Sequence, residues 1–578
     1  MKKFFPACVG ILLFAGGLPF AQAEQPGSTA LSASEASARF KAFAAKIDSA
    51  AVAGVPVQSR GRVKPFDSFA RETIVFLTGK YSMSGMDAGQ IYLALMTSDV
   101  AQQAEIVNVR DPELRTELGL SKARRHYSLQ ELESSRLEEL AKPALMRQER
   151  NARLSARDKA TLELMQQVWL SRGVISGRHL TDGLTFPGAA EHRRSGSMAD
   201  SLAGSPVIEQ AQQYLHALSA GDETLARQSA AAFLAAAKVQ PMPELFSKNL
   251  GKLGLEVWYN HAHIFFWTAI AYLLLGIALI IPHVRKRLGL KTVLGMTAIP
   301  LMAHIAGFAV RVVITGFAPV TNMYGTMVWV AFGLVLFGAF LFLAYRNYAV
   351  MGGVLIGAAA TLLLTENLPL VLSPDMDPIV AVLRNNFWLT IHVLTITISY
   401  AAFTIAMLIG NVALIRGIIS GLRGSRSSQA LQADEAFYKE YGNLTYRVIQ
   451  IGVFFLTAGI ILGGIWADYS WGRFWGWDPK ETWSLIADLG YLSILHAKYL
   501  GWLNGFGILA ASPVGYLLVV MAWYGVNFIL AAGLHSYGFS SGGAAMVGAF
   551  VGVQLALLGV ALAVQQLRRA QAVTKVKS

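Results

Sequence analysis

Long apolar segments constrain this chain more than any other feature. Between residues 261 and 566 the sequence has nine apolar runs, each long enough to cross roughly 30 Å of hydrocarbon as a helix. With 54% hydrophobic and only 15% charged residues, a chain of 578 residues is too apolar for a soluble protein. We predict an all-α polytopic membrane protein with about nine transmembrane helices. The predicted spans are 261–283, 292–315, 324–345, 348–365, 387–415, 447–467, 483–500, 511–533 and 542–566.

The residues before the first span differ in composition. Residues 1–23 have a basic start, an apolar stretch and Ala21-Gln22-Ala23, which is the layout of a cleavable signal peptide. Residues 24–256 are rich in Ala, Gln, Glu, Arg and Ser with helix-like spacing, which predicts a mainly helical exported, periplasmic domain. Its histidines, His126, His179, His192 and His216, are expected to be ordinary surface residues.

The distribution of basic residues predicts the topology. The net charge is +13, and clusters of Lys and Arg follow the first span, flank the 416–447 loop and end the chain. The loops at 316–323, 366–386 and 534–541 carry Arg384 as their only Lys or Arg. By the positive-inside rule the N-terminal domain lies outside and the C-terminus is cytoplasmic, which fits a multi-pass protein of the bacterial cytoplasmic (inner) membrane. The basic charge therefore requires no nucleic acid.

Cysteine usage limits the chemistry of the chain. Cys8 is the only cysteine, and it lies within the predicted signal peptide. The mature chain would have no disulfide, thiol redox centre or cysteine metal site. Any substrate thiol would have to be kept reduced by a separate thiol-reducing partner.

A tryptophan cluster, WGRFWGWDPKETW at 471–483, lies between the sixth and seventh spans. Scattered tryptophans usually form an interfacial belt, but a belt does not require so many so close together. Glycines among them would let the backbone approach a ligand. The surface suits a large flat ligand with an anionic rim, and haem b has that shape. The candidate contacts are Trp471, Gly472, Trp475, Trp477, Asp478 and Trp483, with Arg473 and Lys480 as weaker partners for the propionates or else solvated loop charges.

Two histidines are predicted near the level of this loop. His392 is five residues into an inward-running span, about 7–8 Å below its outer end, and His535 follows an outward-running span. Histidines are common axial ligands of haem iron, although a lone membrane histidine is often a packing residue. His496 lies about 20 Å into its span, at a depth where ionisable groups usually face a cavity or cofactor. His304 is a weak candidate for a second internal ligand, with packing or proton relay as the alternatives.

The motif resembles the tryptophan-rich WWD signature of haem-handling proteins in cytochrome c biogenesis. Segments 304–328, 386–403 and 523–539 resemble the flanking segments of the CcsA (ResC) family, so the similarity covers roughly residues 258–566. The resemblance implies a haem-handling domain at 257–570 with a WWD loop at 467–483, followed by a cytoplasmic tail at 571–578. It also implies that His392 and His535 are the external haem iron ligands, that His496 serves an internal site, and that a CcsB (ResB) partner of System II supplies the second internal ligand.

Three functions remain open at this point. The first is a component of a cytochrome c haem lyase (holocytochrome c synthase), which positions haem for attachment to the C-x-x-C-H segment of apocytochrome c and uses no nucleophile of its own. The second is a haem transporter or chaperone that delivers haem to a separate attachment enzyme. The third is an electron-transferring b-type cytochrome, which gives no reason for the Trp-rich loop. Segment 59–74 resembles a region of fused CcsB–CcsA proteins, but this analogy assigns no role to residues 24–256.

Overall fold

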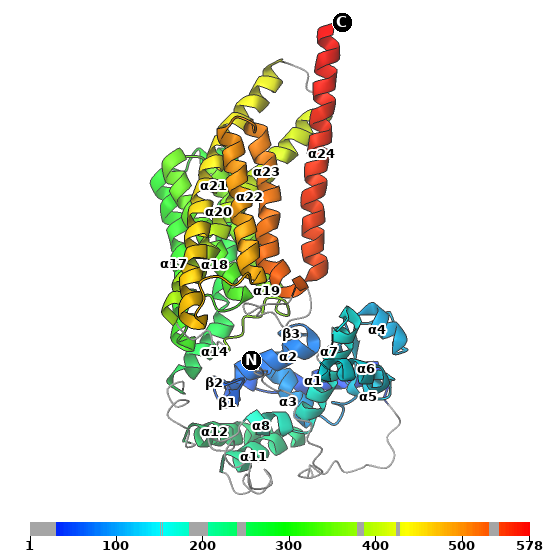
Figure 1. Cartoon of the computed structure of the whole chain (residues 1–578). Helices are drawn as coiled ribbons and strands as arrows, with labels where there is room; N and C mark the ends of the chain where they lie inside the picture. Colours follow the sequence, from blue (N-terminus) through cyan, green and yellow to red (C-terminus); the bar gives the residue numbers. More distant parts are fainter. Residues whose placement is uncertain are drawn as a thin grey trace. The chain divides into compact units, whose positions relative to one another are not determined.

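The chain forms two compact units, Met1–Val257 (unit 1) and Trp258–Ser578 (unit 2), in the computed structural model of Figure 1. The structure describes residues 31–150, 152, 154–183, 206–239, 250–378, 386–423, 428–530 and 543–577. Helices dominate both units, in agreement with the predicted all-α class.

Unit 1 contains helices and three small two-stranded antiparallel sheets. The sheets pair β1 with β2, β3 with β4 and β5 with β6. The strands are β1 (Pro56–Ser59), β2 (Arg62–Pro65), β3 (Ser82–Met83), β4 (Met86–Asp87), β5 (Val107–Asn108) and β6 (His126–Tyr127). The helices are α1 (Ala33–Ala44), η1 (Ser49–Val52), α2 (Phe66–Thr78), α3 (Ala88–Thr97), α4 (Pro112–Glu117), α5 (Leu129–Glu133), α6 (Leu137–Glu149), α7 (Ala156–Ile175), α8 (Arg178–Gly183), α11 (Pro206–Ala220), α12 (Glu223–Val239) and η2 (Leu250–Lys252). Helix α14 (Leu253–Ala262) crosses the boundary between the units.

The core of unit 1 has two parts. The larger brings Phe40, Ile74, Tyr92 and Phe233 together from four helices, and the smaller surrounds Tyr127. Each such side chain contributes roughly 1.5–3 kcal/mol when fully buried. This core holds the described helices of unit 1 together.

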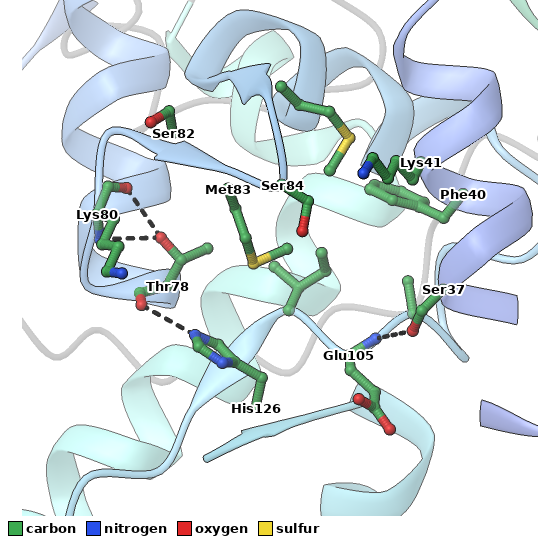
Figure 2. A pocket seen from close by; sticks show the side chains of 13 residues that line it. Ser37, Phe40, Lys41, Thr78, Lys80, Ser82, Met83, Ser84, Glu105 and His126 are labelled. Atoms are coloured by element: carbon green, nitrogen blue, oxygen red, sulfur yellow. Dashed lines mark hydrogen bonds between the residues drawn. The ribbon is translucent and has the colours of Figure 1, made fainter. Parts of the chain in front are cut away.

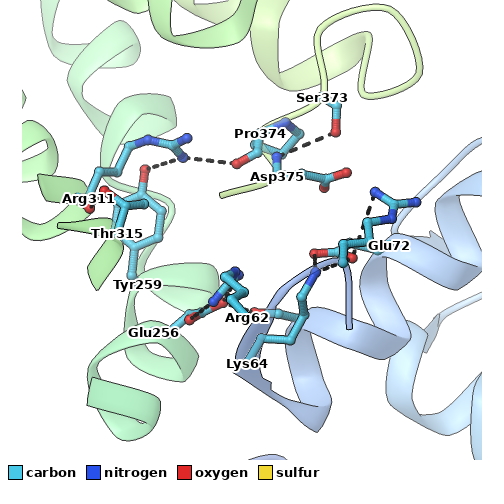
Figure 3. Close-up of polar contacts among 12 residues, drawn as sticks. Arg62, Lys64, Glu72, Glu256, Tyr259, Arg311, Thr315, Ser373, Pro374 and Asp375 are labelled. Carbon is cyan, nitrogen blue, oxygen red and sulfur yellow. Dashed lines mark hydrogen bonds and ion pairs between the residues drawn. The ribbon is translucent and has the colours of Figure 1, made fainter. Parts of the chain in front are cut away.

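The β1–β2 hairpin holds two buried ion pairs (Figure 3). The side chain of Lys64 is fully buried, and its Nζ donates to both carboxylate oxygens of Glu72 at 2.7 Å. Arg62 donates to both oxygens of Glu256 at 2.8 and 2.7 Å, and the Ser68 hydroxyl donates to the same carboxylate at 2.6 Å. Removing one partner of such a pair leaves a buried charge, which costs several kcal/mol. Segment 59–74 therefore has a structural role within unit 1.

Unit 2 consists mainly of long helices, drawn from green to red in Figure 1. They are α15 (Ile264–Ile280), α16 (Pro282–Arg285), α17 (Leu290–Thr315), α18 (Met323–Tyr345), α19 (Tyr348–Asn367), α20 (Asn386–Leu422), α21 (Ser428–Trp471), α22 (Pro479–Tyr499), α23 (Gly505–Val520), the π-helix η4 (Met521–Leu530) and α24 (Ala544–Lys577). Helix α20 packs against α18, α21, α23 and α24. It is therefore at the centre of the unit.

Eight helices among the described residues are long and apolar enough to cross a membrane, compared with about nine predicted spans. The difference is the predicted span 483–500. It does form a helix, α22, which packs against α21 and α23. Asp488, His496 and Lys498 lower its hydropathy. The helix is thus present, but its composition is less apolar than that of its neighbours.

Helices α20 and α21 extend past their apolar segments into the predicted 416–447 loop. Asp434 on α21 is buried and accepts hydrogen bonds from Ser420 Oγ at 2.6 Å and Arg416 Nε at 3.0 Å on α20. Arg568 of α24 reaches the same carboxylate at 3.4 Å. Arg416 and Arg568, which belong to the basic clusters used to predict the topology, thus also connect α20 and α24 to α21 through Asp434.

Candidate functional site

The W-D-P-K-E part of the tryptophan motif forms the start of helix α22. Asp478 is the N-cap, and its carboxylate accepts from the backbone N–H of Lys480 at 2.9 Å. The Glu481 carboxylate accepts from the N–H groups of Asp478 and Gly476 at 3.1 and 2.8 Å, which completes a capping box. Pro479 occupies the first helical turn, where no N–H is needed. Asp478, predicted to contact haem, therefore has a capping role in the loop.

The indole rings of the motif lie on the turn between α21 and α22. Trp471 ends α21, and Gly472 turns the chain with a φ of 68°. The rings of Trp475 and Trp477 pack edge to face with centroids 5.9 Å apart. Trp477 is 70% exposed and has a φ of 56°, a conformation that is costly for a bulky residue. Strain of this kind is often found at ligand-binding sites, and the exposed ring is available to a ligand.

The side chain of His392 on α20 packs against Gly459, Gly463 and Trp466 of α21, and we call these three residues the seat of His392. Its Nδ1 lies 2.8 Å from the carbonyl oxygen of Gly459 and must donate to it, because a carbonyl can only accept. In the neutral ring Nε2 then carries the lone pair, as in most histidine ligands of metals. A Cβ atom on Gly463 would lie 2.5 Å from His392 Cε1, so only glycine leaves room for the ring.

Trp466 links His392 to the tryptophan motif. Its fully buried ring lies parallel to the imidazole, with centroids 6.2 Å apart and planes at 8°. The same ring packs edge-on against Trp471, with centroids 4.7 Å apart and planes at 68°. The sequence analysis did not single out Trp466. The spacing of Gly459, Gly463 and Trp466 on one helical face was a signal that could have identified the seat.

The two cations of the motif are held by neighbouring groups. The Arg473 guanidinium lies 5.8 Å from the Trp471 ring, and its Nη1 is 3.7 Å from Glu481 Oε1. Lys480 Nζ donates to Asn527 Oδ1 at 3.4 Å. Asn527 belongs to η4, and π-helices are frequent at functional sites. The contact brings the segment before His535 to the start of α22; His535 itself lies outside the described residues.

His496 is at a distance from the loop. It follows the N-cap Asp478 by eighteen residues, so it lies about 27 Å further along α22. Its side chain is on the exposed face of the helix, in line with Ile486, Leu489 and Ser493. Its Nδ1 donates to the Leu492 carbonyl at 2.8 Å, which leaves the lone pair on Nε2. The structure thus separates His496 from the group formed by His392, Trp466 and Trp471.

Comparisons with known proteins assign this unit to a family. Residues 320–535 match the Cytochrome C assembly protein family. CcsA of Prochlorococcus marinus (strain AS9601) is 31% identical over 51% of this chain and 98% of its own length. CcsA of P. marinus (strain MIT 9301) is 34% identical over 40% of this chain and 79% of its own length. The chain belongs to the CcsA family of cytochrome c biogenesis proteins.

A longer relative matches both units. Protein NrfI of Wolinella succinogenes is 28% identical over 82% of this chain, a share larger than unit 2 alone, so the similarity extends into unit 1. The match covers 53% of NrfI, and the chain thus spans about half the length of that relative.

His304 lies outside the segment that matches the family description. It is fully buried on α17. Its Nε2 donates to the Val328 carbonyl at 3.1 Å, and its Nδ1 lies 3.4 Å from the Tyr272 hydroxyl. The rings of Phe308, Phe265 and Phe332 surround it at 5.3–5.8 Å. Both nitrogens are engaged, so this geometry favours packing over iron ligation.

Arg311 is two turns further along α17 and anchors a loop (Figure 3). Its side chain is buried, donates to the Pro374 carbonyl at 3.1 Å and lies 5.0 Å from the Tyr324 ring. Asn322 donates to the carbonyls of Ser373 and Asp375 at 3.1 and 3.0 Å. The two residues fix the loop after α19.

Unit 1 contains a hollow of about 420 Å³ beside the β3–β4 hairpin (Figure 2). Met83 and Met86 line it together with Lys41 and Lys80, while His126 Nε2 lies 3.2 Å from the Thr78 carbonyl. The sequence analysis did not predict this hollow.

The prediction that unit 1 histidines are ordinary surface residues is wrong for His179. Its ring stacks on Phe69 with centroids 4.6 Å apart, and Nδ1 lies 2.9 Å from the Tyr92 hydroxyl. Burial, together with the charge of Arg60, lowers its pKa to about 4. His216 is exposed, and His192 lies outside the described residues.

Proposed function

We propose that this CcsA-family protein binds haem b beside the Trp-rich loop and holds it for covalent attachment to apocytochrome c, as a component of a cytochrome c haem lyase. The observation that carries the proposal is the seat of His392. Its Nδ1–H is fixed by Gly459, its lone pair is on Nε2, and Trp466 connects it to the loop. This is the arrangement in which a histidine serves as an axial iron ligand.

The loop supplies groups that suit the rest of the haem. Trp475 and Trp477 offer aromatic surface, and Arg473, next to the Trp471 ring, offers a guanidinium for a propionate. His535 is proposed as the second external ligand. Its support is the Lys480–Asn527 contact, which packs the preceding helix η4 on α22.

The chemistry requires orientation rather than a nucleophile from this chain. Each cysteine thiol of a C-x-x-C-H segment adds across a haem vinyl group, so that sulfur bonds to one vinyl carbon and the proton goes to the other. Holding the vinyl edge beside the thiols makes the encounter effectively intramolecular. One external histidine would yield its position on the iron to the histidine of the substrate.

A CcsB/ResB-like membrane protein is the proposed partner. His496 lies on the exposed face of α22, where a helix of another chain could complete an internal haem site. We place unit 1 outside a bacterial cytoplasmic membrane and the C-terminus inside, on the distribution of basic residues. A thiol-reducing protein would keep the apocytochrome cysteines reduced.

Haem transport or chaperoning alone is the second candidate. It is favoured by the separation of His496 from the loop, because a carrier would need histidines at two places along its path, such as His392 on α20 beside the loop and His496 far along α22, to pass haem across the membrane. In this case another enzyme would form the thioether bonds.

Expression of a C-x-x-C-H reporter in a host without its own maturation genes tests the proposal. The protein is produced with and without the partner, and the reporter is denatured and stained for covalent haem. Stained reporter that disappears in His392→Ala and His535→Ala variants supports the lyase function. Haem that copurifies with the protein while the reporter stays unmodified in the presence of the partner supports the carrier.

A further inference from the structure

Trp466 occupies the last position of a face of α21 that is shaped around His392. Gly459, Gly463 and Trp466 follow one another at intervals of four and three residues, so they lie on the same face of the helix. The first gives its carbonyl to Nδ1, the second leaves room for the ring, and the third stacks on it. All three contacts converge on one imidazole.

The hydrogen bond alone does not determine the plane of the imidazole. It fixes the position of Nδ1, but the side-chain torsion of histidine next to the ring is broad. The parallel face of Trp466, at 8° to the imidazole, supplies the second constraint. Since a ligand nitrogen must point at the iron, this constraint sets the direction of Nε2.

Trp466 also touches the first tryptophan of the motif. Its ring is fully buried, and the Trp471 ring packs edge-on against it at 4.7 Å. A movement of Trp471 that accompanies ligand binding at the loop would therefore press on the ring that orients the histidine. His392 and Trp471 come from different helices, α20 and α21, and the Trp466 ring contacts both of their rings.

We propose that Trp466 is a positioning residue that sets the plane of His392 and couples it to the Trp-rich loop, so that the loop controls how readily this histidine leaves the iron. The inference rests on the proposed haem function. Trp466 touches neither iron nor substrate in this account and acts through His392.

The test compares Trp466→Leu and Trp466→Phe in the full chain purified with haem. We measure the rate at which added imidazole replaces the protein ligand on the iron. Trp466→Leu is expected to accelerate this exchange by about tenfold to a hundredfold, the usual range for outer partners of a metal ligand, and Trp466→Phe to restore most of the wild-type rate. The matched control is Trp267→Leu, since Trp267 is an exposed tryptophan of α15.

A second measurement needs no haem. The ¹⁵N NMR spectrum of labelled His392 in the haem-free protein reports its tautomer, which is the Nδ1–H form in wild type and is expected to become mixed in Trp466→Leu. Trp471→Leu is expected to shift it in the same direction, and this variant keeps the test available if Trp466→Leu does not fold. If the wild-type protein binds no haem, the proposed function is overturned, but the tautomer of His392 can still be compared between wild type and variants. Unchanged exchange and an unchanged tautomer in folded variants overturn the role of Trp466.

Discussion

The surroundings of His392 and His304 show two ways in which the helices of unit 2 hold an imidazole. At His392 one nitrogen is fixed by a backbone carbonyl, and the ring is half-buried next to an exposed loop. At His304 both nitrogens have polar neighbours, and aromatic rings enclose the side chain completely. The comparison teaches that two histidines of one helical unit can differ in which ring nitrogen a backbone carbonyl binds: Nδ1 at His392 and Nε2 at His304.

Substituting the two histidines gives the largest expected contrast. His392→Ala is expected to abolish covalent haem on the reporter and to remove most copurified haem, because the proposed axial ligand is lost. His304→Ala is expected to lower the free energy of unfolding by about 1–3 kcal/mol or more, since the Val328 carbonyl and the Tyr272 hydroxyl lose a buried partner. Haem per folded molecule is measured by the pyridine haemochrome assay.

The comparison would break if folded His304→Ala protein lost its haem while His392→Ala kept it. Thermal unfolding in detergent, followed for both variants, separates loss of haem from loss of fold.

Gly463→Ala addresses the seat of His392 without changing any polar group. The added Cβ would lie 2.5 Å from the imidazole, so the ring has to move and Nε2 is redirected. We expect about tenfold to hundredfold weaker haem binding, as for the loss of an outer partner of a metal ligand, measured by titration of haem-free protein. Gly353→Ala on α19 is the matched control, because an added Cβ there meets nothing within 4 Å. Equal affinities in the two variants would show that the seat does not orient the ligand.

His179 of unit 1 extends the comparison to a third environment. Burial lowers its pKa to about 4 in the folded chain from about 6.5 in the unfolded chain. The unfolded chain therefore binds the extra proton between these values, and the stability that His179 contributes is present above pH 6.5 and lost as the pH falls toward 4. Between pH 7.5 and 5 unit 1 is expected to lose up to about 2 kcal/mol of stability.

Hydrogen exchange of unit 1 amides in the full chain measures this loss after correction for intrinsic rates. His179→Gln retains an acceptor for the Tyr92 hydroxyl but does not titrate, so it is expected to reduce the pH dependence. The same dependence in wild type and variant would assign the effect to other groups.

The smallest expected effect is at the capping box of α22. Asp478→Ala removes the side-chain acceptor for the Lys480 N–H, and such a change costs about 1 kcal/mol. The turn that carries the indole rings is expected to loosen, with a severalfold loss of haem affinity, and Asp478→Asn is expected to recover most of it. A loss as large as that of His392→Ala would show that Asp478 contacts haem directly.

The sequence predicted the helical membrane unit and its Trp-rich loop because both depend on local composition. Long apolar runs have few alternatives to a helix in a membrane, and the cluster 471–483 is visible without any tertiary contact. The limits of α20 and α21 were underestimated because their polar ends, around Asp434, are stabilised by contacts with other helices.

The environment of each histidine could not be predicted in the same way. His304 and His392 look alike in sequence, and their difference arises from residues on neighbouring helices, such as Tyr272 and Gly459. The sequence does not separate the two roles of Asp478, since a carboxylate before a helix fits both capping and ligand binding. Trp466 was missed because its significance depends on how α20 pairs with α21.

The buried pair of Arg62 and Glu256 has a consequence for the order of events during biosynthesis. The two residues are separated by 194 positions, so the strand that carries Arg62 leaves the ribosome long before its carboxylate partner. Until Glu256 is synthesised, a nascent chain that buried Arg62 would bury an uncompensated charge. Helix α15, the first membrane-crossing helix, begins only eight residues after Glu256. The carboxylate that compensates Arg62 and the start of this apolar helix are therefore synthesised almost together.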